Sequence, residues 1–327
     1  MGNCLVTKLA GVTGNVLLPK LGELPLQIKP VDSPNEKSQK LSLGFNAASD
    51  LRVVGGSFVD SSLSTDKGAN MHVEAGAAAD IYLKNVASNL FIGNKYALTL
   101  ISMDRAAEGF SFDLSQLKYS KDMKLLLLGS AKVDNISEVS NFKKLTFLTC
   151  FSCNDILDIS NIKDLPLIDI GFGFNKNITG DIANIPSTAV NISIYGTDIY
   201  GNYESILGRK LSNLAGIFQD TRVGGDLSKM PSTETHVNAS KNPSVFSWKT
   251  ERDNSYKIVS LEGSVNFGDD LDAMLINQAK CQIGFVSSDE SYKKLISCSG
   301  NRTSASDSAI QTLKGKGYNL HVNNVQM

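Results

Sequence analysis

The residues with the most potential for chemistry are few and lie far apart in the chain. The histidines are His72, His236 and His321, and none has a carboxylate neighbour at the spacing of a metal site. The pair Cys150-x-x-Cys153 is typical of a zinc or redox site when a second such pair or two histidines complete it. The sequence contains neither complement, so we interpret this pair as part of the fold.

Two other clusters resemble ligand sites only in part. The stretch Gly171-Phe172-Gly173-Phe174 lacks the third glycine and the strand-to-helix setting of a dinucleotide-binding loop. The stretch Asp269-Asp270-Leu271-Asp272 lacks the spacing and the closing glutamate of a calcium loop, so we expect a turn before an inward-facing Leu271. The sequence therefore predicts no catalytic, metal or cofactor site.

Short triplets that begin with Asp or Asn recur at nearly even spacing. Their apolar members are 22, 23, 23 and 45 residues apart, and they are Leu114, Ile136, Ile159, Ile182 and Leu227. A fixed period of this length is typical of repeat architectures. We expect each triplet to bury its apolar residue, while the neighbouring polar side chains hydrogen-bond the backbone at a bend.

A second pattern with the same period matches the leucine-rich-repeat signature L-x-x-L-x-L-x-x-N/C. The best match is Leu145-x-x-Leu148-x-Cys150-x-x-Cys153. Each copy predicts a short strand with two inward side chains, and stacked copies pair in one parallel sheet. The remaining residues of each copy predict irregular or 3₁₀ returns. The first inward residues of the eight copies are 20 to 24 residues apart, at Leu125, Leu148, Ile168, Ile192, Leu214, Val237, Val259 and Ile283.

The repeats divide the chain into four segments. Residues 1–40, broken by glycines and prolines, predict an extended arm, and residues 41–110 predict a small β domain or, alternatively, an early degenerate part of the array. Residues 111–303 form the array, and residues 304–327 predict a short helix and a strand that cap it. The predicted fold class is mainly β: a leucine-rich-repeat-like solenoid with irregular returns, preceded by an arm and a small β domain and closed by a helix–strand cap.

Composition narrows the possible environment and partners. The net charge of -1 over 327 residues does not favour binding to nucleic acid or to an anionic membrane. The odd, sparse set of five cysteines predicts free thiols in a reducing cytoplasm. The sequence shows no ordinary signal peptide and no apolar run long enough to span a bilayer, so we expect no membrane insertion.

The outward side chains of the predicted sheet carry the binding prediction. Aromatic and small polar residues on one exposed sheet suit recognition of a protein or a glycan, and the alternative is that they pack under a neighbouring subunit or domain. Two of these residues come just after a strand, where the pattern does not fix their side. The candidate binding residues are Phe147, Phe151, Phe172, Phe174 and Tyr195.

Several short stretches resemble one family of viral proteins. Residues 1–9 and 18–23 look like the start of structural proteins of crAss-like bacteriophages that infect Bacteroides, and residues 180–184, 225–228 and 306–318 are similar to the repeats and the close of such proteins. The resemblance implies a virion component, either a head fibre or a capsid decoration. It also implies a homotrimer that is anchored by its N-terminal part and presents the remainder outward.

We therefore expect a non-enzymatic virion protein, made in the host cytoplasm, that binds capsid proteins and its own copies. Its repeats would present a surface for a host glycan or protein, without nucleic acid or cofactor. The alternative is a bacterial leucine-rich-repeat adhesin or interaction protein. A glycan-processing enzyme would need paired carboxylates, which the repeat face does not show. The anchoring residues expected in the arm are Leu5, Leu9, Leu18 and Leu21.

Overall fold

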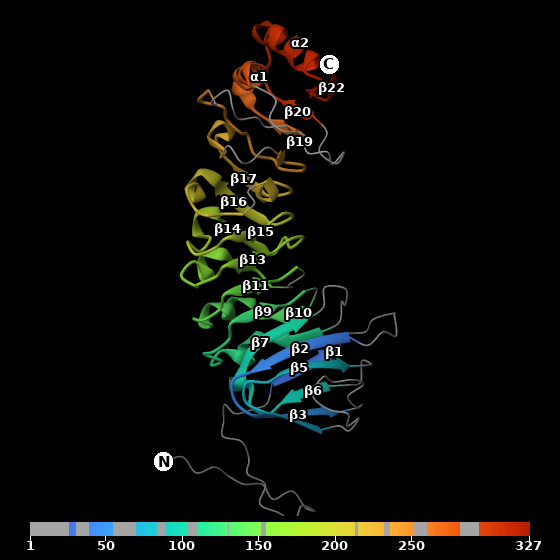
Figure 1. Ribbon diagram of the computed structural model, residues 1–327, viewed down its shortest axis with the longest axis vertical. Helices are drawn as coiled ribbons and strands as arrows, with labels where there is room; N and C mark the ends of the chain where they lie inside the picture. Colours follow the sequence, from blue (N-terminus) through green and yellow to red (C-terminus); the bar gives the residue numbers. More distant parts are fainter. Residues whose placement is uncertain are drawn as a thin grey trace, which may run out of the picture.

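The computed structural model describes residues 26–30, 39–54, 70–83, 89–103, 110–129, 131–151, 155–212, 215–231, 236–251, 260–281 and 294–327. Most regular structure in these ranges is β-strand. The strands stack into an elongated body, with the N-terminal segment at one end and the C-terminal segment at the other (Figure 1). The prediction of a mainly β protein is confirmed.

One seven-stranded sheet joins the N-terminal segment to the first repeats. In spatial order its strands are β15 (Asn191–Ser193), β13 (Asp169–Gly171), β11 (Phe147–Thr149), β9 (Leu125–Leu127), β7 (Leu98–Met103), β2 (Gln39–Phe45) and β5 (Ala78–Leu83). Strands β7, β9, β11, β13 and β15 are parallel to one another. The residues in register across them are Ile101, Leu126, Leu148, Ile170 and Ile192. All five side chains are buried, so each strand covers the apolar residues of its neighbour as the repeat pattern predicted.

The predicted inward positions need correction in two copies. Leu125 and Leu127 were expected to point inward, but both are half-buried, whereas Leu126 and Leu128 are fully buried. A run of four leucines satisfies either alternation, so the pattern could not fix the register there. Ile168 was also expected inward and is 41% exposed; it precedes the strand, and the residue in register is Ile170.

A second set of parallel strands follows the first strand of each repeat. Strand β8 pairs with β10, and β12, β14, β16 and β17 pair in that order. These strands carry the chain from the long sheet to the returns. Their bounds are β8 (Phe110–Asp113), β10 (Lys132–Asp134), β12 (Leu157–Asp158), β14 (Ile178–Asp181), β16 (Asp198–Asn202) and β17 (Arg222–Gly224).

The bends into the returns repeat one hydrogen bond. Asp113, Asp158, Asp181, Asn202 and Asp226 each accept, on a side-chain oxygen, the N–H of the residue two positions later, at 2.8 to 3.1 Å. This bond satisfies a backbone donor that the following 3₁₀ turn would leave unpaired. The apolar residue after each polar one is buried. The triplet prediction is confirmed for the four triplets that begin with Asp, whereas Asn135, with a φ of 59°, makes no such side-chain bond, although Ile136 is buried.

The bends also contain a copy that the sequence pattern missed. Asn202 is followed by the buried Tyr203, which fills the 45-residue gap between Ile182 and Leu227. The expected 3₁₀ returns are confirmed in the described repeats. They are η2 (Leu114–Leu117), η3 (Ile136–Asn141), η4 (Ile159–Ile162), η5 (Ile182–Asn184), η6 (Tyr203–Ile206), η7 (Ala215–Ile217) and η8 (Leu227–Lys229).

The core becomes aromatic toward the C-terminal half. Tyr203 and Phe218 meet edge to face at 5.3 Å between ring centroids, and Phe218 meets Phe246 in the same way at 5.5 Å. Trp248 packs against Phe267 at 6.1 Å and is only 3% exposed. Each such pair adds about 0.5–1.5 kcal/mol to the stabilisation from burial.

A five-stranded sheet with two helices forms the C-terminal end. Val237, Leu261, Ile296 and Leu320 are in register. The elements are β18 (His236–Asn238), β19 (Ser260–Asn266), η9 (Gly268–Asp270), α1 (Leu271–Lys280), β20 (Leu295–Ser299), η10 (Ser304–Ser306), α2 (Asp307–Gly315), β21 (Asn319–Val322) and β22 (Val325–Gln326).

The last predicted repeat copy has Ile283 as its first inward residue, so in the signature it begins at Lys280. This prediction is wrong at Lys280, which is the last residue of helix α1. Most of that copy lies outside the described residues. The ladder continues instead at Ile296, 35 residues after Leu261, because α1 lengthens this return. The helix and the strand expected after residue 304 are present as α2 and β21, and Leu271 is buried as expected.

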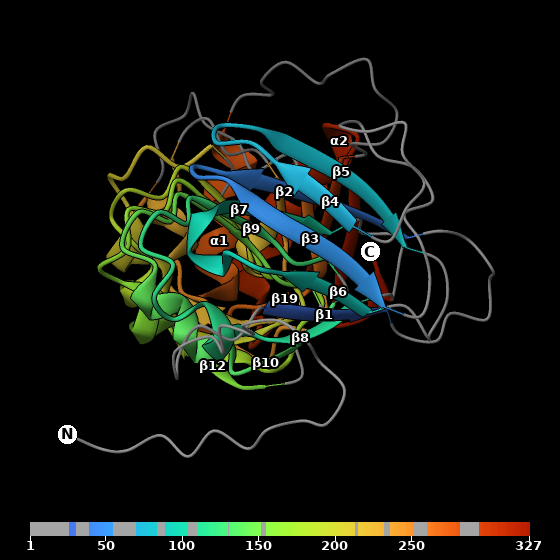
Figure 2. The same cartoon turned by 90° about the horizontal axis from the view of Figure 1, so that it is seen from below.

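The N-terminal segment is continuous with the repeats in both sheets. A six-stranded sheet contains β10 and β8 together with β1 (Leu26–Pro30), β6 (Asn89–Ile92), β3 (Ser49–Val54) and β4 (Asn70–Val73). Strands β3, β4 and β6 lie at the near end of the stack when it is viewed from below (Figure 2). Along the chain, the short turn η1 (Lys95–Ala97) lies between β6 and β7. The sheets therefore run on past the boundary predicted at residue 110.

The expectation of free cysteines is wrong for Cys150, which is disulfide-bonded. Cys281 and Cys298 are free and buried. The reducing environment that was inferred from free thiols loses this part of its support, because disulfides persist mainly in oxidising compartments. Cys4 and Cys153 lie outside the described residues.

Candidate binding face

The outward side chains of β9, β11, β13 and β15, with the residues just after these strands, form one surface that we call the outer face. Phe147, Asp169 and Asn191 are in register along its first column, and Phe147 is 37% exposed. Asn191 donates a side-chain hydrogen bond to Asp169 at 3.1 Å. The outer face thus carries one exposed aromatic ring beside a short polar row.

Glycines form the floor of the next part of the outer face. A Cβ atom on Gly171 would lie 2.9 Å from Thr149 Cγ2 and 3.4 Å from the ring of Phe151. A Cβ atom on Gly173 would lie 2.6 Å from the ring of Tyr195. The two glycines therefore leave room for aromatic rings from the repeats on either side, which explains this glycine-rich stretch without a nucleotide.

Three of the five candidate residues were expected to point outward, and these lie at exposed or half-buried positions, as does Phe174, whose side the pattern left open. Phe147 and Phe174 are exposed, and Phe151 and Tyr195 are half-buried. Phe172 is a correction: it is fully buried in the core. Its side chain points inward like that of Ile170, and its N–H still bonds the next repeat, donating to the Ser193 carbonyl at 2.7 Å just after β13 ends.

Phe174 combines high exposure with an unfavourable backbone conformation. Its φ is 61° and its side chain is 73% exposed. Its ring meets that of Tyr195 edge to face at 4.7 Å, and its N–H donates to the Tyr195 carbonyl at 2.8 Å. The left-handed region costs a residue with a Cβ about 1–2 kcal/mol. We call Phe151, Phe174 and Tyr195, lying over Gly171 and Gly173, the aromatic platform.

The residues that correspond to Phe174 in later turns are of other types. Gly196 and Asp220 also have positive φ and donate their N–H to the next repeat, as Phe174 does. Lys241 follows at the next turn with a φ of 60°. Glycine and aspartate tolerate this conformation better than a bulky residue does. The aromatic side chain at 174 is therefore a local exception that the fold itself does not require.

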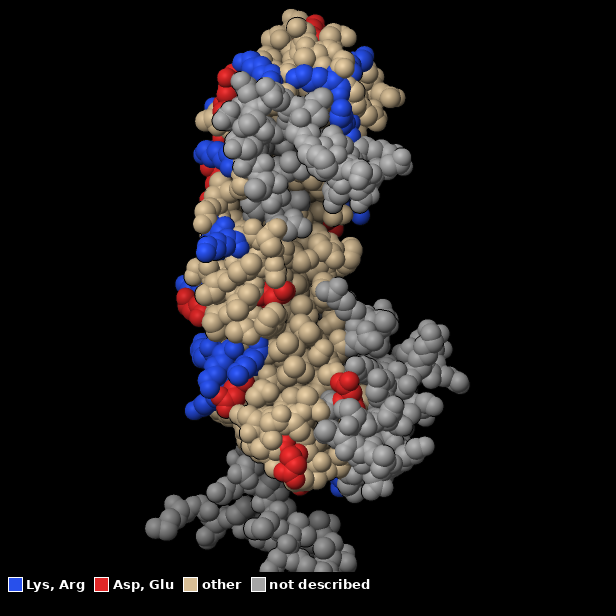
Figure 3. All heavy atoms as spheres, viewed as in Figure 1, with Lys and Arg blue, Asp and Glu red and all other residues tan. Residues whose placement is uncertain are grey.

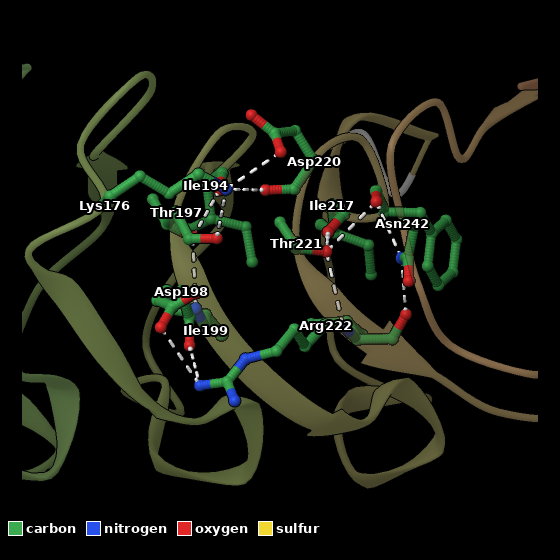
Figure 4. A network of polar contacts seen from close by, with 12 residues as sticks. Lys176, Ile194, Thr197, Asp198, Ile199, Ile217, Asp220, Thr221, Arg222 and Asn242 are labelled. Atoms are coloured by element: carbon green, nitrogen blue, oxygen red, sulfur yellow. Dashed lines mark hydrogen bonds and ion pairs between the residues drawn. The ribbon is translucent and has the colours of Figure 1, made fainter.

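Polar side chains fix the turns next to the platform (Figure 4). Lys176 Nζ donates to the Asp220 carboxylate at 2.9 Å and to the Asp220 carbonyl at 2.8 Å, two repeats away. The buried Thr197 donates to the Ile194 carbonyl at 2.6 Å. An exposed ion pair of this kind adds little stability, but the bonds of Lys176 join turns that lie two repeats apart.

The last position of the repeat signature, which favours Asn or Cys, satisfies backbone groups at the turns. The Asn242 amide donates to the carbonyls of Phe218 and Val223 at 2.8 and 2.9 Å, and Thr197 occupies the same position two repeats earlier. Both side chains satisfy backbone groups at a turn. These residues belong to the structure of the repeat.

The three histidines lie outside the strands that form the outer face. His72 Nδ1 is 2.8 Å from Asp50 Oδ1 and Nε2 is 3.4 Å from Glu74, and the hydrogen bond with Asp50 raises the pKa of His72. His236 and His321 are half-buried on β18 and β21. In the described part of the chain, no three histidine, cysteine, aspartate or glutamate side chains are arranged so that they could hold a metal ion.

The acidic cluster near α1 is used within the fold. Burial raises the pKa of Asp270, but hydrogen bonds from Lys249 and from the Trp248 N–H outweigh it and hold that pKa below its ordinary value. Asp272 accepts from the Thr303 N–H at 2.9 Å. These contacts tie neighbouring repeats together.

Charge is distributed in small groups on the face that Figure 3 shows. Lysine and arginine gather in patches near its margins, with acidic residues close by, and wide uncharged areas lie between them. Within the ranges that the structure describes, no helix is long and apolar enough to cross a membrane. The expected anchoring residues Leu5, Leu9, Leu18 and Leu21 lie outside those ranges.

No family model and no curated protein matches the chain. Similar solved structures include the plant peptide hormone receptor RGFR1 in complex with RGF2, with 15% identity over 63% of this chain and a TM-score of 0.34. An internalin (inlF) from Listeria monocytogenes is 19% identical over 69% of this chain and 74% of its own, with a TM-score of 0.32. A plant ice-binding protein is 18% identical over 52% of this chain and 67% of its own, with a TM-score of 0.29. The match spans 37% of the receptor chain.

Proposed function

We propose that this chain is a non-enzymatic, leucine-rich-repeat-like interaction protein whose solenoid binds a partner through the outer face. The observation that carries the proposal is Phe174, an exposed aromatic residue held at a φ of 61° beside Tyr195. The left-handed turn recurs in later repeats, but an aromatic residue there carries strain that glycine would avoid. Large exposed aromatic side chains are also the residues that contribute most to binding energy in interfaces.

The rest of the outer face supports binding better than catalysis. Asp169 is the one carboxylate among the described outward residues of β9, β11, β13 and β15, and Asn191 already bonds it. Hydrolysis by paired carboxylates needs a second carboxylate at a defined distance. The ladder of parallel strands keeps the outward side chains at fixed spacing, which is what a preorganised binding surface requires.

A substitution in the centre of the outer face tests this proposal. Phe147→Asp should weaken binding to any ligand of this face by about tenfold or more, because it places a charge where an aromatic contact was. The wild type and the variant would be compared on arrays of immobilised proteins and glycans. Tyr119→Asp, at a residue 58% exposed after η2, is the matched control. Ligands that bind Phe147→Asp and wild type equally well would contradict the proposal.

A role in a bacteriophage virion remains a second proposal, supported by the sequence resemblance. Its described part includes residues 306–318, which form α2 and the turn before β21. In that role, the chain would be anchored as a trimer on the capsid, and the same outer face would meet the host. Mass spectrometry of purified virions tests it: the protein should be present in particles, and its absence would favour a bacterial interaction protein.

A further inference from the structure

We propose that the aromatic platform binds a neutral glycan, with a sugar ring stacked on Phe174 and contacting the neighbouring Tyr195, whose ring stands nearly perpendicular to that of Phe174. This inference deepens the proposed function and rests on it. One face of a pyranose ring consists of C–H groups that pack on an aromatic ring, while its hydroxyls need hydrogen-bond partners around the edge. The platform and its surroundings offer both kinds of contact.

The aromatic part of the platform is open to solvent. The Phe174 side chain is 73% exposed, and Tyr195 and Phe151 are half-buried on the neighbouring repeats. Gly171 and Gly173 carry no side chain that would stand between these rings. The rings therefore come from three successive repeats with only backbone beneath them, so a ligand can contact more than one of them.

The hydrogen-bonding part of the platform is neutral. The Tyr195 hydroxyl forms no hydrogen bond with any described residue. Ser193 and Asn191 follow on the same side of β15, at about 6.6 and 13 Å along the strand. The hydroxyls of Tyr195 and Ser193 can donate to and accept from sugar hydroxyls. The Asn191 amide, which already bonds Asp169 and Ser212, keeps one N–H that can donate.

The charges near the platform argue for an uncharged ligand. The Lys176 ammonium is paired with Asp220, so it is not free to bind an anionic group. Asp169 is the described carboxylate on this face, and it would repel sulfate or uronate groups. A neutral glycan avoids the desolvation of an unpaired charge, which makes it a better fit than an acidic polysaccharide.

The conformation of Phe174 makes a sharp test possible. Phe174→Gly removes the ring and places glycine at a φ of 61°, where glycine is favoured, so this variant should stay folded. Phe174→Tyr keeps the ring. A neutral-glycan array would first widen the choice of probe. Calorimetric titration with maltoheptaose, xylohexaose, chitohexaose and mannohexaose would then compare wild type, both variants and the control Tyr119→Gly.

The proposal requires binding of at least one neutral oligosaccharide that weakens about tenfold or more in Phe174→Gly. Binding should stay within about threefold of wild type in Phe174→Tyr and Tyr119→Gly. Equal binding by Phe174→Gly and wild type would place the glycan elsewhere and overturn the proposal. If no neutral glycan binds, the proposal is wrong. If a protein or an acidic glycan then binds wild type but not Phe147→Asp, the proposed binding function would hold although the glycan proposal is wrong.

Discussion

The backbone strain at Phe174 can be measured by comparing two glycine variants of one aromatic pair. Phe174→Gly and Tyr195→Gly each remove one ring of the edge-to-face contact at 4.7 Å. Both lose about 0.5–1.5 kcal/mol of that contact, and both gain the flexibility of glycine in the unfolded chain, which costs about 0.5–1 kcal/mol. These terms cancel when the two variants are compared.

What remains is the difference in backbone conformation and burial. Phe174 has a φ of 61°, so Phe174→Gly gains back about 1–2 kcal/mol of left-handed strain. Tyr195 has no such strain to lose, and its half-buried ring also gives up packing area. We therefore expect Phe174→Gly to lie within about 1 kcal/mol of wild type and above Tyr195→Gly by about 1–2 kcal/mol or more.

Urea unfolding followed by far-ultraviolet circular dichroism measures this difference. The two variants should share one m-value and differ in midpoint, because a common slope is needed before midpoints can be read as stability. Two outcomes would refute the reasoning. Either Phe174→Gly is destabilised as much as Tyr195→Gly, or Phe174→Ala, which retains the Cβ, is as stable as Phe174→Gly.

Three further predictions concern a glycine and a bend in the repeats and a histidine in the N-terminal segment. Gly173→Ala should cost about 1–3 kcal/mol, because the new methyl group would lie 2.6 Å from a tyrosine ring, whereas Gly216→Ala, which meets nothing within 4 Å, should change stability little; equal thermal midpoints would contradict this. Asp181→Ala should lower stability by about 1 kcal/mol through loss of its 2.9 Å bend hydrogen bond, and Asp181→Asn should retain most of it in the same melting assay. The pKa of His72, followed by proton NMR, should lie above its ordinary value of 6.5 and fall toward it in Asp50→Asn. Since this pKa is raised by folding, the stabilisation is complete below pH 6.5 and is lost as the pH rises through the folded-state pKa; an unchanged titration in Asp50→Asn would rule out the contact.

The repeat itself could be predicted from the sequence because its period is written in apolar residues. Leu148 and Ile192 stand at the expected inward positions, and Ile159 and Ile182 at the expected bends. The register failed at Leu125, where consecutive leucines fit either face. In such a run only the hydrogen-bond pairing of the strands decides which residue points inward.

The bend at Tyr203 and the helix α1 were missed for a different reason. Tyr203 is fully buried in a place that other repeats fill with aliphatic residues, so a search for aliphatic spacing passes over it. Helix α1 replaces a short return, and its length is compatible with several repeat registers. In both cases a tertiary contact decided the structure where the local pattern allowed more than one.

The binding face was only partly accessible to sequence reasoning. Alternation placed Phe147 outward, and continuing it past β13 would have turned Phe172 inward. The left-handed backbone of Phe174 had no sequence signal, because the residue types that favour positive φ are absent at that position. The aromatic platform becomes visible only when Gly173 and Tyr195 from neighbouring repeats are placed together.

The burial of Trp248 has a practical consequence for following how the stack unfolds. It is the one tryptophan in the chain, and it lies against Phe267 in the C-terminal half. Fluorescence excited at the red edge of the absorption spectrum, where tryptophan absorbs and tyrosine does not, therefore reports only on the surroundings of Trp248 near β18 to β20. Circular dichroism, in contrast, averages over every strand. Coincident curves from the two signals would show that the whole array loses its structure as one cooperative unit, and separated curves would show that the two halves come apart in sequence.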